Sequence, residues 1–198
     1  MPLRLIQPAA SVAEVVRLQL AGMAQQQQFR TRELAAARPA ALGLAAPHPV
    51  FNLGLDEIGK PGALDRAAMA AWRYLVTSGS NVIAAAESSA SHAKGRAVFS
   101  GTNEGVFVRA SAEAIADAQT WPEIRAGHYA LGLMHVPALY VVALWLRDED
   151  GRDGGDRFVP LTPAPAPLVG GKRIGSAGFE QALVEVKRRR GACEGASS

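Results

Sequence analysis

The sequence predicts an α+β fold, a single domain in which a mixed or antiparallel sheet of about five or six strands has helices on both faces. Three observations lead to this prediction. Helix-capping signals and helical apolar patterns recur along the chain, and they include a long N-terminal helix. Runs rich in valine and aromatic residues lie between these patterns and are typical of strands. One such run, residues 138–146, is apolar in both alternating sets, so both of its faces need cover.

The long N-terminal helix is predicted over residues 11–37. Ser11 and Glu14 form a capping box, in which each side chain accepts a hydrogen bond from a backbone N–H of the first turn. Pro39 ends the helix because proline disfavours helical geometry in the residue before it. The first half carries an apolar stripe that predicts packing on the domain. The stripe consists of Val12, Val16, Leu20 and Met23.

The second half of this helix is predicted to act as an interaction arm. Beyond the stripe, the same face meets Gln27 and Arg30, which are costly to bury without partners. We therefore expect residues 1–38 to form a helical arm that binds a protein partner or a second copy of the chain, with Phe29 and Leu34 as contact residues. The alternative is a helix that bends back near Gly22 and packs along its whole length.

The rest of the chain is predicted to form an α+β domain over residues 39–190, followed by a disordered tail at 191–198. Proline and glycine are frequent in residues 39–62, which indicates an irregular connector. Apolar spacing at i, i+4, i+7 and i+11 predicts a helix over the next segment, and the segments after it alternate between strand and helix signals. The predicted elements are a helix at 63–76, a strand at 81–87, strands at 95–100 and 106–110 around a turn at 101–105, a broken helix at 111–126, a strand at 158–161 and a helix at 177–190.

Residues 126–146 contain no Asp, Glu, Lys or Arg. Their length permits a membrane span, but His135 and Pro137 lie near the middle, where polar and helix-breaking residues are costly. Valine and aromatic residues favour strands instead. We therefore predict two strands, 129–135 and 138–146, with a bend between them.

Composition excludes several classes of site. The net charge of +3 is too small to indicate a nucleic-acid partner. The single cysteine excludes an internal disulfide and a metal site built from cysteine pairs. No motif predicts a metal or a cofactor, and whether the chain is an enzyme stays open. The alanine-rich composition, together with an N-terminus that lacks an unbroken apolar segment, predicts a soluble bacterial protein of the cytoplasm.

Three function classes follow. The leading expectation is a non-enzymatic protein-interaction or adaptor module that uses the N-terminal helix. The alternative is a small enzyme or a small-ligand or anion-binding protein, with a pocket near His128, His135 and Arg96. Polar side chains between Ser88 and Asn103 could also form an anion site, although we favour two polar turns as their explanation. The third class is a membrane-associated protein that uses residues 126–146.

Overall fold

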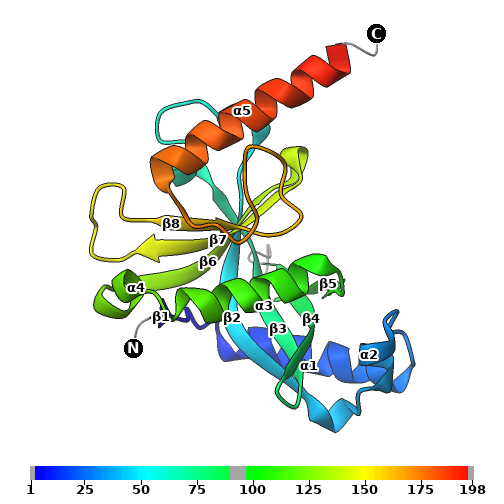
Figure 1. Cartoon of the computed structure of the whole chain (residues 1–198). Helices are drawn as coiled ribbons and strands as arrows, with labels where there is room; N and C mark the ends of the chain where they lie inside the picture. The colour runs from blue at the N-terminus through cyan, green and yellow to red at the C-terminus, as the bar shows by residue number, and fades with distance from the viewer. Residues whose placement is uncertain (1–2, 90–96, 196–198) are drawn as a thin grey trace.

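The computed structural model describes residues 3–89 and 97–195, which form a mixed sheet covered by α-helices (Figure 1). Short 3-10 turns connect several of the elements. The strands are β1 (Leu3–Arg4), β2 (Leu42–Asn52), β3 (Ala68–Ser78), β4 (Asn81–Ser89), β5 (Phe99–Asn103), β6 (Tyr129–Val136), β7 (Val141–Asp148), β8 (Arg157–Pro160) and β9 (Ile174–Gly175). The helices are α1 (Ala10–Gln25), α2 (Arg32–Ala36), α3 (Val106–Ala118), α4 (Pro122–Ala126) and α5 (Ser176–Gly195).

The sheet confirms the α+β class but is larger than predicted, with nine strands among the described residues. Its order is β5-β4-β3-β2-β6-β7-β8-β9, and β1 pairs with β6 beside β2. β2 and β1 run parallel to β6, whereas the other neighbours are antiparallel. The sheet is therefore mixed, and β2 joins a half made from β3, β4 and β5 to a half made from β6 to β9 together with β1.

β2 occupies the segment that we expected to be an irregular connector. Pro47 is accommodated because the pairing with β3 shifts register between Ala45 and His48, on either side of this proline. Ala46 has a left-handed backbone with φ of 45° at this bulge. Proline is tolerated in sheets at bulges of this kind. The density of prolines and glycines therefore predicted the local irregularity but not the strand around it.

β3 replaces the helix predicted over residues 63–76, and that prediction was wrong. The apolar spacing that suggested a helix coincides with an alternating pattern over the same residues. Leu75 packs on one face of the sheet, whereas Tyr74 and Val76 pack on the other. Pairing with β2 on one side and β4 on the other overrides the weak helical preference of the alanines.

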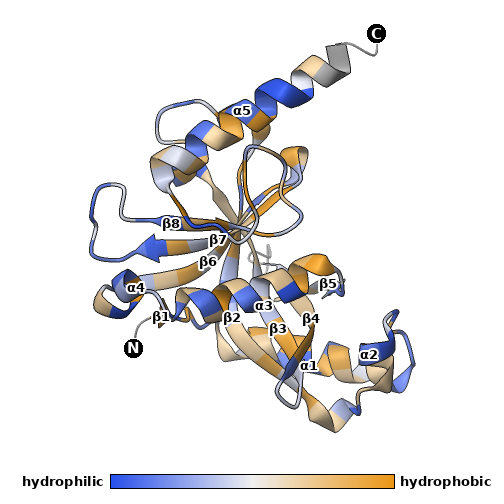
Figure 2. Cartoon of the chain, in the orientation of Figure 1, coloured by the Kyte–Doolittle hydropathy of each residue, from blue (hydrophilic) through white to orange (hydrophobic). Residues whose placement is uncertain are grey.

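The helices cover different parts of the two faces of the sheet. Figure 1 shows α3 crossing one face of β2, β3 and β4, with α1 behind the same strands. Apolar residues of α3 share a buried cluster with residues of β3, β6 and β7, whereas α5 packs on the other face of β6, β7 and β8. In Figure 2 the strands are mostly apolar in colour, whereas the loop between β7 and β8 and part of α5 are hydrophilic. The prediction of helices on both faces is confirmed.

β7 is an interior strand, as predicted. It lies between β6 and β8, and all six residues from Val141 to Leu146 are buried. The bend before it is a 3-10 turn over Pro137–Leu139. Tyr140, which we expected inside the strand, has a left-handed backbone and is 76% exposed. Residues 126–146 thus contain two strands, and no helix in the described part of the chain is long and apolar enough to span a membrane.

The N-terminal helix is shorter than predicted. α1 ends at Gln25, and Gln27 takes a left-handed backbone with φ of 53° that turns the chain back toward the sheet. Phe29 and Leu34 are consequently buried, at 8% and 0% exposure, in one cluster with residues of α1, β3 and β4. The structure therefore places both side chains in the core instead of on an interaction surface.

Two further boundaries differ from the prediction. The predicted turn at 101–105 is mostly strand β5, and the predicted strand at 106–110 is the first part of α3. Gly105 precedes α3 without a side-chain cap, so the usual helix-start signal is missing there. At the other end of the chain α5 continues to Gly195, beyond the expected end at 190, while residues 196–198 lie outside the described part.

Candidate functional site

The structure separates the residues that we expected to share a pocket. His128 precedes β6, has a 78% exposed side chain and pairs through Nδ1 with Asp150 at 2.7 Å. His135 lies near the opposite end of β6 and is half-buried. Seven residues of strand separate the two histidines by roughly 23 Å, so they do not form one site. Arg96 lies outside the described residues.

A different set of polar side chains gathers on the face of the sheet that α3 covers. We call it the Arg73 cluster, and it comprises His48, Arg73, Glu87, Ser89 and His135. Opposed residues of antiparallel strands extend from the same face. His48 of β2 is opposite Arg73 of β3, which is in turn opposite Glu87 of β4.

Ser89 and His135 complete this cluster. Ser89 is opposite Ala71, two residues from Arg73, and so extends from the same face. Alternation along β6 places His135 on the face of Leu131 and Leu133, which pack with Ala71. Four strands therefore contribute polar side chains to one region of an otherwise apolar face.

Arg73 is the most unusual member of the cluster because it is a charged residue with only 3% exposure. Its Nη1 lies 3.2 Å from Oε1 of Glu87, in an ion pair where the glutamate side chain is 32% exposed. Burial lowers the pKa of Arg73, and Glu87 opposes that shift. The other edge of the guanidinium, formed by Nε and Nη2, is buried and has no hydrogen-bond partner among the described residues.

His48 is fully buried and holds one defined tautomer. Its Nδ1 lies 2.7 Å from the carbonyl oxygen of Ala46, which can only accept, so Nδ1 carries the proton. Burial, the largest cause, and the charge of Arg73 together lower the pKa of His48 to about 4, although the hydrogen bond to Ala46 opposes the shift. The ring is therefore neutral at pH 7, and its bare Nε2 is a buried acceptor without a partner in the described chain.

The remaining two members lie at the border of the cluster. The Oγ of Ser89 is also buried without a partner among the described residues. Burial lowers the pKa of His135, Glu87 raises it, and Arg73 lowers it, so all three side chains are within electrostatic range.

The unpartnered atoms give the cluster its chemical character. Leaving a buried donor or acceptor unpaired costs about 1–3 kcal/mol, and more for a charged group. Here a guanidinium edge, an imidazole nitrogen and a hydroxyl share that condition. The Nε–Nη2 edge of arginine matches two oxygens of a carboxylate or phosphate. Metal binding has no comparable support, because no group of three or more His, Cys, Asp or Glu side chains with suitable placement occurs among the described residues.

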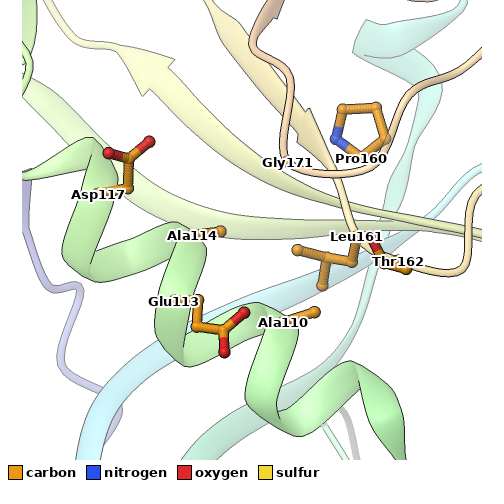
Figure 3. A pocket seen from close by; sticks show the side chains of 8 residues that line it. All are labelled: Ala110, Glu113, Ala114, Asp117, Pro160, Leu161, Thr162 and Gly171. Atoms are coloured by element: carbon orange, nitrogen blue, oxygen red, sulfur yellow. The ribbon is translucent and has the colours of Figure 1, made fainter.

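A cavity of about 230 Å³ between α3 and the loop after β8 is a weaker candidate (Figure 3). Figure 3 shows Glu113 and Asp117 of α3 beside this cavity, with Leu161 and Thr162 on the opposite wall. Both carboxylates are exposed, and none of the lining residues has a buried polar atom that lacks a partner. The cavity therefore shows no sign of an absent binding partner.

A larger groove of about 650 Å³ is charged, and none of its lining residues has a buried side-chain polar atom without a partner in the described part of the chain. The guanidinium of Arg147 stacks over Phe51 and Trp145, at 5.1 and 4.9 Å from the ring centroids. The indole Nε1 of Trp145 donates to Asp156 at 2.6 Å. Because the groove contains no buried polar atom without a partner among the described residues, it supports ligand binding less than the Arg73 cluster does.

Sequence reasoning identified two members of the cluster and missed three. His135 was expected in a ligand site, and Ser89 lies in the polar segment that was considered as an anion site. The signal for Arg73 is a single charge inside a long apolar run, which becomes informative only when the run is interpreted as a buried strand. Comparison with protein-family models, curated proteins and solved structures gave no match to this chain.

Proposed function

We propose that this chain binds a small oxyanion, a carboxylate or a phosphate, at the Arg73 cluster. The observation that carries the proposal is the buried Nε–Nη2 edge of Arg73, which has no partner among the described residues. Glu87 holds the opposite end of the guanidinium and so orients the free edge. An arginine fixed in this way gains a pair of parallel hydrogen bonds from a ligand with two adjacent oxygens.

The other members of the cluster favour a small ligand. Ser89 adds a buried hydroxyl that can donate to an anion, and the small side chain of Ala71 lies between Ser89 and β2. Because the donor atoms are buried, a ligand reaches them only when the structure opens locally. We therefore expect association to be much slower than diffusion allows, because binding requires a conformational change.

The test is calorimetric titration and thermal unfolding of the full chain with phosphate, sulfate, acetate and glycolate. Arg73→Lys keeps the positive charge but removes the planar edge, so binding is expected to weaken about tenfold or more. Arg109→Lys is the matched control, since Arg109 lies exposed on α3 and no binding change is expected. Equal affinity in both variants, or no binding of any probe up to about 10 mM, which corresponds to roughly 3 kcal/mol, overturns the proposal.

A further inference from the structure

The unprotonated Nε2 of His48 restricts which anions can satisfy the Arg73 cluster. Ala46 accepts the proton of Nδ1, so a neutral imidazole has only a lone pair at Nε2. His48 and Arg73 are directly opposed on β2 and β3, and both extend into the same cluster. A ligand held by Arg73 therefore meets an acceptor as well as donors, and a fully deprotonated anion leaves that acceptor unpaired.

The negative charge of Glu87 also limits which anions can bind at the Arg73 cluster. The ion pair at 3.2 Å already balances the charge of Arg73. A second anion beside Arg73 lies within a few ångströms of the Glu87 carboxylate, and like charges at that separation repel. Repulsion is smaller for a singly charged ligand, so the charge of Glu87 favours monoanions, such as dihydrogen phosphate or a 2-hydroxycarboxylate, over dianions.

We infer that the ligand of the Arg73 cluster is an oxyanion that carries its own O–H group beside the charged oxygens, as protonated phosphate and 2-hydroxycarboxylates do. This inference rests on the proposed anion site and adds the ligand class. The charged oxygens accept from Nε and Nη2 of Arg73, and the hydroxyl donates to Nε2 of His48. All four unpaired atoms of the cluster then gain partners if Ser89 donates to a remaining oxygen.

The experiment compares two pairs of anions that differ in this hydroxyl. At pH 7.5 phosphate retains at least one proton and sulfate retains none, and glycolate has a hydroxyl next to its carboxylate that acetate lacks. Titration calorimetry on the full chain is expected to show about tenfold or greater preference for the hydroxyl-bearing member of at least one pair. A preference confined to the first pair identifies phosphate chemistry, and one confined to the second identifies hydroxycarboxylates.

His48→Asn supplies the matched variant. The asparagine amide can still donate to the carbonyl of Ala46, but it removes the acceptor at the position of Nε2. The preference is expected to fall to about one, while the weaker anion of each pair binds as it does to the unmodified chain. Equal affinity within both pairs overturns the inference and leaves anion binding intact, whereas failure of all four anions to bind removes the proposed function itself. A preference that persists in His48→Asn also overturns the inference.

Discussion

Replacing Leu34 tests whether the N-terminal segment is part of the core or an interaction arm. Leu34 is 0% exposed and packs with Val16, Tyr74 and Val76. Truncation of a fully buried leucine to alanine costs about 2–5 kcal/mol. For a chain of this length, that loss lowers the thermal midpoint by roughly 4–20 °C.

Leu18 provides a control in the same N-terminal segment. It is 65% exposed on α1, so Leu18→Ala is expected to change stability by no more than about 0.5 kcal/mol. The assay is thermal unfolding followed by circular dichroism, with light scattering to measure the association state of each variant. An unchanged midpoint for Leu34→Ala together with altered association would refute the core assignment and restore the interaction arm.

Three further predictions address the buried polar and apolar groups. Burial lowers the pKa of His48 to about 4, so the unfolded chain takes up the proton first. The contribution of His48 to the free energy of unfolding is therefore fully present above about pH 6.5 and is lost as the pH falls toward 4, by up to about 3 kcal/mol. Urea unfolding of His48→Asn over the same pH range should show a smaller decline. Leu144→Asp should abolish soluble expression, because it buries an unpaired charge in the interior strand β7, and a cooperatively unfolding variant would contradict this. Asp156→Ala removes the acceptor of the Trp145 indole and should cost about 1–3 kcal/mol in urea unfolding followed by tryptophan fluorescence, a result that an unchanged midpoint would exclude.

Local sequence patterns predicted the secondary structure correctly for segments whose own residues determine whether they form a helix or a strand. The strands on either side of Pro137 were predicted because apolar residues occupy both alternating sets in 138–146 and proline interrupts the run. The strand at 81–87 and the final helix were predicted for similar reasons and agree with β4 and α5. Two of these patterns had an alternative, since the alanines of 81–87 also favour a helix and the length of 126–146 also permits a membrane span.

Distant pairing determined the elements that local signals did not. β2 contains Pro47 and Pro49, and β3 contains an alanine pattern with helical spacing, yet each becomes a strand because it completes the hydrogen bonding of its neighbours. The turn at Gln27 likewise appears only when Phe29 and Leu34 have a buried surface to cover. Propensity differences of a few tenths of a kcal/mol per residue are too small to compete with this burial.

The Arg73 cluster likewise depends partly on the sequence and partly on the tertiary structure. The amino-acid order makes Arg73 an isolated charge among apolar residues and makes His48 one of several histidines without a motif. Only the pairing of β2, β3 and β4 places residues 48, 73 and 87 side by side, and only the cover on that face removes His48 and Arg73 from water. The chemistry of the candidate site depends on both conditions, because an exposed arginine and histidine would satisfy their hydrogen bonds with solvent.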